Sequence, residues 1–327
     1  MSHMTYPEAA IIGLIQGVSE MFPVSSLGHS VLIPALVGGS WAQDLNAATP
    51  QSPYLAFIVG LHVATAIGML VYFWRDWLRI IGAFFGSLRA RRVETADQKL
   101  AWMIICATIP VGLVGLVADH ETRVLFAKPV LAGVFLMING GILYAAERFR
   151  TRASLQADAD LAEERENEHG PLTRTTAAHA SGQRAVRQQE VSLAIRADER
   201  LAAMGYRQAT LIGTAQILAL LAGISRDGVA MVTGMFRGLA REDAVRFAFL
   251  LATPVILAAG LLELPKLTGP LGHGIHGQIL VGSLLSGIGA YVSVRYLVRY
   301  FQTRSLTPFA VYCVIFGLGS VIYLSVK

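Results

Sequence analysis

The sequence predicts an all-α polytopic membrane protein with an inverted-topology repeat, in which each half contains a re-entrant pair of half-helices and three transmembrane helices. Three observations predict it. Hydrophobic residues form 54% of the 327-residue chain and charged residues only 15%, a composition too apolar for an ordinary water-soluble domain. Six segments are long and apolar enough to cross a bilayer as helices. Two further segments, 11–30 and 211–230, resemble each other.

The first element, over 8–36, is expected to be a re-entrant pair of half-helices. Pro23 and the serines Ser25 and Ser26 interrupt its apolar run near the middle, where proline breaks a helix. Broken backbone at membrane depth is tolerated only where it is buried in protein or lines a polar cavity. The chain should therefore turn there and return to the side from which it entered.

Three spanning helices should follow this pair and complete a first repeat over 1–146. A spanning helix needs about 20 predominantly apolar residues. Such segments occur at 54–74, 100–118 and 129–146. The next stretch, 147–207, is polar and has little apolar periodicity until about 193, so we expect a cytoplasmic linker that is partly helical or disordered and carries no catalytic residue.

The second repeat, over 208–327, follows the same order of elements. It begins with a re-entrant pair at 208–236, which Gly223 and Gly228 interrupt. Its spanning helices are expected at 244–264, 277–298 and 306–326.

Loop charge predicts the orientation of each element. The loop 37–53 contains no Lys or Arg, whereas 75–99 contains six, so the positive-inside rule places the first loop outside and the second in the cytoplasm. One re-entrant pair plus three spans is an odd number of crossings, which turns the second copy upside down. The net charge of +5 is accounted for by these loops and implies no nucleic-acid partner.

The ionisable residues of the two re-entrant segments stand at positions that the copies do not share. The two segments share five residues at corresponding places, which in the first copy are Ile12, Gly13, Gln16, Ser25 and Gly28. Their sequences are IIGLIQGVSEMFPVSSLGHS (11–30) and LIGTAQILALLAGISRDGVA (211–230). Glu20 and His29 belong to the first copy alone, and Arg226 and Asp227 to the second. Inverted repeats of this kind place a substrate near the midplane between the copies, so these side chains should converge on one intramembrane site.

Each candidate residue also has a structural interpretation. Ser25 and Ser26 can bond to their own helix backbone, His29 can be a packing residue, and Glu20 can pair with Arg226 only to hold the repeats together. A charge at the centre of a membrane helix costs about 2.5 to 3.5 kcal/mol. A structural ion pair would explain neither the first-copy hydroxyls nor the glycines around Arg226, so we favour a functional site.

The residue types suit a phosphate. Gln16 and Glu20 are four residues apart and share a helix face. Glycine-rich breaks expose backbone N–H groups at half-helix starts, where an anion is favoured, and the Arg226 guanidinium matches phosphate oxygens. A carboxylate beside a phosphate implies a divalent cation. Metal, arginine, hydroxyl and a proton carrier are the requirements of phosphoryl transfer. His62 is balanced between lining this cavity and packing.

The runs QGVSEMFPVSSLGH (16–29) and YRQATLIGTAQILALLAGISRDG (206–228) resemble the undecaprenyl-diphosphate phosphatase family, the bacitracin-resistance type of integral membrane phosphatase. The resemblance implies hydrolysis of undecaprenyl diphosphate to undecaprenyl phosphate and inorganic phosphate, which recycles the lipid carrier for cell-wall synthesis. It further implies a divalent cation, Mg²⁺ or Ca²⁺, and a site that opens to the outer face of the bacterial cytoplasmic membrane.

The same resemblance assigns roles by residue. It makes Glu20 a metal ligand or base, Ser26 the nucleophile or a phosphate-orienting hydroxyl, His29 the proton carrier and Arg226 the phosphate clamp. The remaining phosphate-binding positions are Ser25, Ser225, Gly223 and Gly228.

The chain departs from the family pattern at both candidate metal positions. Gln16 stands where many members have glutamate, and Asp227 stands where serine is usual, so both are further candidates for the metal site.

A transporter is the alternative function. Inverted repeats around a central anion site also build alternating-access carriers, so the same site could serve a polyprenyl-phosphate flippase. In either case the partners are a polyprenyl lipid and the bilayer. The oligomeric state stays open, with a homodimer as one arrangement.

Overall fold

The computed structural model describes residues 4–45, 52–126, 128–167, 197–268 and 274–326. Over this part of the chain the regular elements are helices, and six are long and apolar enough to cross a membrane. They are α4 (Pro53–Tyr72), α6 (Ala96–Phe126), α7 (Pro129–Asn167), α11 (Arg241–Thr268), α12 (His276–Thr303) and α13 (Thr307–Val326). The prediction of an all-α polytopic membrane protein is confirmed.

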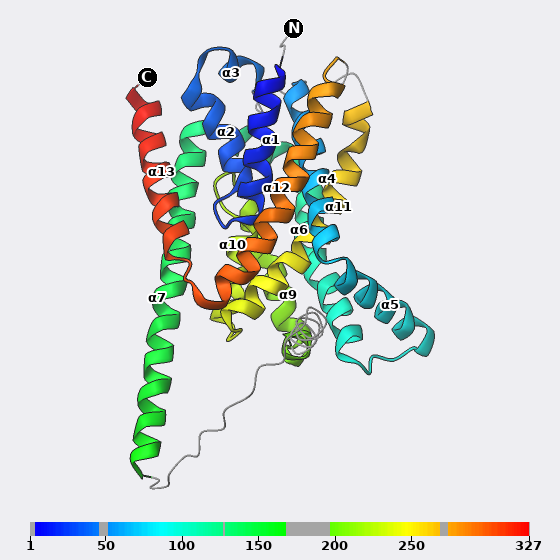
Figure 1. The fold of residues 1–327 in the computed structure, drawn as a ribbon, viewed down its shortest axis with the longest axis vertical. Helices are drawn as coiled ribbons and strands as arrows, with labels where there is room; N and C mark the ends of the chain where they lie inside the picture. Colours follow the sequence, from blue (N-terminus) through cyan, green and yellow to red (C-terminus); the bar gives the residue numbers. More distant parts are fainter. Residues whose placement is uncertain (1–3, 46–51, 127, 168–196, 269–273, 327) are drawn as a thin grey trace, which may run out of the picture.

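The first motif forms α1 (Tyr6–Met21) and α2 (Ser26–Val37), followed by the short α3 (Gly39–Asp44). Thr5 begins α1 with a capping box, because Glu8 accepts from Thr5 N at 2.7 Å while its own N–H donates to the Thr5 hydroxyl. The break falls where proline was expected to interrupt the helix. α2 then returns toward the end of the molecule at which α1 began (Figure 1).

The second motif forms α9 (Tyr206–Ala215), the 3₁₀ helix η1 (Gln216–Leu220) and α10 (Arg226–Phe236). It approaches from the opposite end of the molecule (Figure 1). Gly223 has a φ of +114° at the turn, and a Cβ there would collide with the carbonyl oxygen of Ala132 on α7. Only glycine satisfies both the dihedral angle and the close approach.

The two halves pack against each other reciprocally. α1 packs on α12 of the second half, and α9 packs on α6 of the first. Gly13 lies against the backbone of Gly282, and Gly213 lies against the backbone of Ala107, so each contact is a close backbone approach. Two structurally related halves would pack in this reciprocal way. The inverted repeat itself, with boundaries after residues 146 and 207, stays a prediction.

The end of the molecule opposite the two termini holds structure that the sequence did not predict. The segment 75–99, expected to be a loop, contains most of α5 (Trp74–Ala90), which projects sideways from the bundle (Figure 1). α7 continues into the expected linker as far as Asn167, and 197–203 is helical. The described parts of this stretch are therefore largely helical.

Ion pairs fasten the end of this linker to the bundle. Asp198 is 1% exposed and accepts from Arg79 on α5 and from Arg246 on α11, the latter at 2.8 Å. Arg200 donates to Asp243 at 2.6 Å. These contacts make 197–203 part of the folded body.

Candidate active site

The breaks of the two motifs meet in the middle of the molecule. Ser25 Oγ, at the N-cap of α2, accepts from Gly28 N and from Gly223 N, both at 3.2 Å. A Cβ on Gly28 would lie 3.0 Å from the Gly223 Cα, so the two turns are in direct contact. The expected convergence of the copies is therefore observed.

Ser225 has the corresponding place in the second copy. Its hydroxyl caps α10 by accepting from Gly228 N at 3.1 Å. Its backbone N–H donates to Asn139 Oδ1 at 3.0 Å, and Asn139 Nδ2 donates to Pro23 O at 2.9 Å. Ser25, Ser225 and Gly228 thus maintain the turns, and the buried Asn139 on α7 joins one break to the other.

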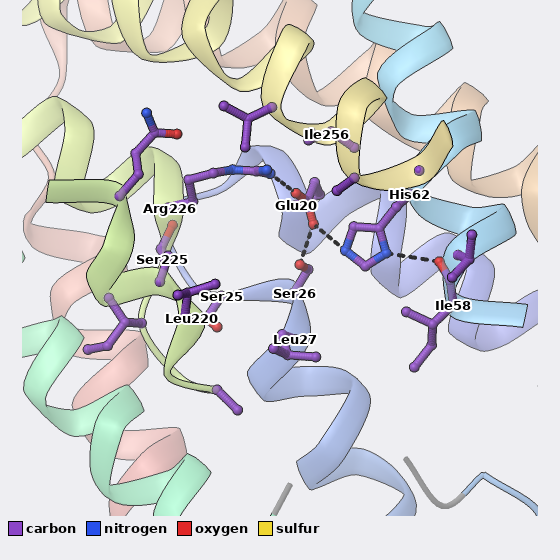
Figure 2. Close-up of a pocket in the computed structure, with 18 of the residues that line it drawn as sticks. Glu20, Ser25, Ser26, Leu27, Ile58, His62, Leu220, Ser225, Arg226 and Ile256 are labelled. Carbon is purple, nitrogen blue, oxygen red and sulfur yellow. Dashed lines mark hydrogen bonds and ion pairs between the residues drawn. The ribbon is translucent and has the colours of Figure 1, made fainter. Parts of the chain in front are cut away.

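Glu20 lies at the centre of the cluster, near the end of α1. Its Oε1 accepts from Arg226 Nη2, and its Oε2 accepts from Ser26 Oγ and from Gln16 Nε2, the last at 2.8 Å. His62 Nε2 lies 3.5 Å from the same Oε2. Figure 2 shows Arg226, Ser26 and His62 converging on this carboxylate from three elements.

The burial of Glu20 makes these contacts necessary. The Glu20 side chain is 4% exposed and that of Arg226 is 16% exposed. Removing one member of a buried ion pair typically costs about 3 to 5 kcal/mol, because the other charge is left uncompensated. The Ser26 hydroxyl, already directed at the carboxylate, has the arrangement of a nucleophile beside its base.

His29 is not brought to this cluster. Its Nδ1 lies 2.7 Å from Ser25 O and its Nε2 lies 2.7 Å from the hydroxyl of Tyr312 on α13. The ring also stacks on Phe316, with centroids 5.2 Å apart. The histidine that faces Glu20 is His62, held by Nδ1 at 2.9 Å from Ile58 O.

A cavity of about 350 Å³ extends from the Glu20 cluster. Its polar end includes Ser26, His62 and Arg226. Most of its wall is apolar and comes from α2, α4, α11, η1 and the turn before α10. A polar end with apolar walls suits a charged head group on a hydrocarbon chain.

The candidate metal ligands form a sparse set. Among the described residues, no group of three or more His, Cys, Asp or Glu side chains could hold a metal ion. Asp227 is 1% exposed, and neither carboxylate oxygen has a hydrogen-bond partner there, although Arg226 Nε lies 3.9 Å from Oδ1. Oxygens from Glu20 and Ser26 fit a hard cation that keeps most of its ligands from phosphate and water. Gln16 faces Glu20 with its nitrogen.

The sequence did not single out Asn139, gave Gln216 no chemical role and left the role of His62 undecided. Asn139 is a polar residue within an expected span, which was the available signal. Gln216 was noted only as the residue that matches Gln16 in the second copy. His62 could be interpreted either as a cavity-lining residue or as a packing residue.

Comparison with known proteins agrees with this geometry. The family model described as bacitracin resistance protein BacA matches residues 9–319. The chain belongs to the BacA family. The BacA match includes both motifs, five of the six spanning helices and α13 as far as residue 319, so the site described above lies inside it.

Curated relatives of this BacA chain match over nearly their whole length. A protein of Mycolicibacterium paratuberculosis named undecaprenyl-diphosphatase is 53% identical over 326 residues, covering 100% of this chain and 99% of the relative. Undecaprenyl-diphosphatase 2 of Frankia alni is also 53% identical, covering 97% of each chain. Undecaprenyl-diphosphatase of Granulibacter bethesdensis is 35% identical, covering 97% and 96% respectively.

Proposed function

We propose that this BacA-family protein is a membrane hydrolase that converts undecaprenyl diphosphate and water into undecaprenyl phosphate and inorganic phosphate. The observation that carries the proposal is the convergence of Glu20, Ser26 and Arg226 at the polar end of an apolar cavity. The reaction regenerates the lipid carrier used in cell-wall synthesis, and the family name ties it to bacitracin resistance.

The cavity supports binding of the diphosphate at the Glu20 end. Arg226 can turn from the carboxylate to the terminal phosphate, for which a guanidinium fork is well matched. α2 and α10 both begin beside this point, and their N-terminal dipoles favour an anion. The first prenyl units would follow the apolar wall, with the rest of the tail among the helices or in the bilayer.

Ser26 is proposed as the nucleophile and Glu20 as its base. Ser26 Oγ attacks the terminal phosphorus while its proton passes to Glu20, and the bond from phosphorus to the bridging oxygen breaks, which releases undecaprenyl phosphate. Water then cleaves the Ser26–phosphate bond, releasing inorganic phosphate and restoring the hydroxyl. Glu20 gives up its proton between the two steps, and His62 at 3.5 Å is the nearest ionisable neighbour that could receive it.

A divalent cation, Mg²⁺ or Ca²⁺, is part of the proposal. Glu20 would hold it together with substrate oxygens, and Gln16 and Asp227 are the further candidate ligands. When bound, such an ion neutralises charge on the phosphate oxygens. Glu20 and Arg226 would then no longer need to compensate each other, since each would face an opposite charge on the ion or the substrate.

We place the opening of the site on the outer face of the bacterial cytoplasmic membrane. The cavity reaches Leu55, near the start of α4, and Glu263, toward the end of α11. These helix ends lie toward the end of the molecule that carries α3 and both termini (Figure 1). The arginine-rich segment 75–99 is at the opposite end, which the positive-inside rule assigns to the cytoplasm.

The decisive experiment measures inorganic phosphate released from undecaprenyl diphosphate by the purified protein with Mg²⁺ or Ca²⁺. Glu20→Gln and Arg226→Ala should each lower kcat/KM by roughly 10²-fold or more, since each removes a charge that acts in the transition state. Glu94→Gln and Arg299→Ala change exposed charges and should leave the rate unchanged.

Two outcomes would contradict the proposal. Normal release by both site variants would separate the activity from this cluster. Transbilayer movement of polyprenyl phosphate without any release by the wild type would instead favour the flippase.

A further inference from the structure

Gln216 is the counterpart of Gln16 in the second motif, but the two amides have different surroundings. Gln16 Nε2 donates to Glu20 Oε2 at 2.8 Å. Four residues after Gln216 the chain has Leu220 instead of an acid. The second copy therefore does not offer Gln216 the carboxylate that satisfies Gln16.

The Gln216 amide is buried without an acceptor. The residue is 1% exposed and lines the cavity that also contains Glu20, Ser26 and Arg226. Its Nε2 has no hydrogen-bond partner among the described residues. An unpaired buried donor costs about 1 to 3 kcal/mol, and folded proteins leave few such groups unless a ligand or water uses them.

The geometry of the Gln216 side chain allows its amide to donate a hydrogen bond to a ligand in the cavity. The amide plane can turn by half a revolution about its last torsion, which exchanges the oxygen and the nitrogen and can present the NH₂ group to the cavity. The apolar wall of the cavity offers no acceptor. The prenyl chain of the substrate also has no hydrogen-bond acceptor. The diphosphate oxygens are therefore the acceptors that the substrate would bring into this cavity.

We propose that Gln216 is a substrate-binding residue that donates a hydrogen bond to a non-bridging oxygen of the bound diphosphate. This inference rests on the proposed function and adds a contact to it. Copy two then supplies two kinds of donor, the Arg226 guanidinium and the Gln216 amide, while copy one supplies the acceptor Glu20. The glutamine shared by the copies has taken a different role in each.

The proposed contact predicts a particular kinetic effect. A neutral amide that binds a non-bridging oxygen holds the ground state and the transition state alike, so its loss raises KM more than it lowers kcat. A hydrogen bond to a charged group contributes about 1.5 to 3 kcal/mol. Gln216→Met, which keeps the length and removes the donor, should therefore raise KM by roughly 10- to 100-fold.

The same substitution, Gln216→Met, should not lower the thermal stability of the protein. Methionine removes an unsatisfied buried donor and fills the space with apolar atoms, so the ligand-free variant should melt at the wild-type temperature or above it. A glutamine with a structural role would behave in the reverse way, because its loss would lower Tm and leave KM unchanged.

The experiment compares Gln216→Met and Gln216→Glu with the wild type in phosphate release and in thermal unfolding. Gln216→Glu keeps the shape but places a charge against the diphosphate, and should raise KM further. Gln208→Met is the matched control, since the Gln208 amide donates to Arg237 O at 2.7 Å on the exposed surface, and KM should not change.

The possible results separate the two proposals. Raised KM in both Gln216 variants, with no loss of Tm in Gln216→Met, supports the contact. Unchanged KM in an active Gln216→Met variant, or a lower Tm in that variant, overturns the contact while the hydrolase assignment stands. Absence of release by the wild type would overturn the proposed function itself, and with it the diphosphate as the partner of Gln216.

Discussion

At the residue scale, the chemistry of the site depends on which buried polar groups are matched. Glu20 was identifiable from the sequence because a carboxylate in an apolar run is costly, and Arg226 for the same reason. The surroundings of His29 were not, since the spacing puts it on one face with Ser25 but does not say which helices that face meets. Here both of its ring nitrogens are engaged by Ser25 and Tyr312, and the histidine that lies beside Glu20 is His62.

Asn139 provides a prediction at this scale. Asn139→Leu would leave Ser225 N–H and Pro23 C=O without their partners, at about 1 to 3 kcal/mol each, and would free the two breaks from each other. We expect a lower Tm and a reduced rate of phosphate release. Asn139→Asp keeps the acceptor for Ser225 N–H and should retain more activity than Asn139→Leu. Equal Tm for Asn139→Leu and the wild type would contradict this role.

At the element scale, α5 carries the clearest unpredicted feature. Its inner face packs on α6, where Trp102 donates to Ser87 at 2.9 Å. A separate apolar stripe is exposed at helical spacing, formed by Trp74, Leu78, Ile81, Phe85 and Leu88. Periodicity could have indicated this amphipathic helix, but the six basic residues of 75–99 were interpreted only as loop charge. Such a helix is expected to lie in the cytoplasmic interface with its stripe in the acyl region.

The placement of α5 can be tested with spin labels in a background lacking Cys106 and Cys313. A label at Leu78→Cys should be reached by oxygen dissolved in the bilayer. A label at Ala90→Cys, an exposed position about 120° around the helix axis from Leu78, should be reached by a water-soluble nickel chelate instead. Equal access of the chelate to both labels would place α5 in water.

At the scale of the whole molecule, the linker connects two halves whose contacts are made elsewhere. α1 packs on α12 and α9 on α6. In the described parts of the linker, ion pairs hold its end at 197–203 and its first residue, Glu147. We expect that removing most of 150–190 leaves phosphate release at the wild-type rate. Asp198→Asn, by contrast, should lower Tm, because Arg79 and Arg246 would lose a buried partner. Loss of activity in a stably inserted deletion variant would reveal a role for the linker.

The spanning helices, the two broken segments and the types of residue at the site could be predicted from the amino-acid sequence alone. These follow from local quantities: the length of an apolar run, the breaks at proline and glycine, and the cost of a charge in a membrane. The folded structure was needed to show that His62 instead of His29 faces Glu20, that Asn139 joins the breaks and that the Gln216 amide nitrogen is buried without an acceptor. Each of those facts depends on how side chains from distant helices pack together, and hydropathy and spacing carry no information about that packing.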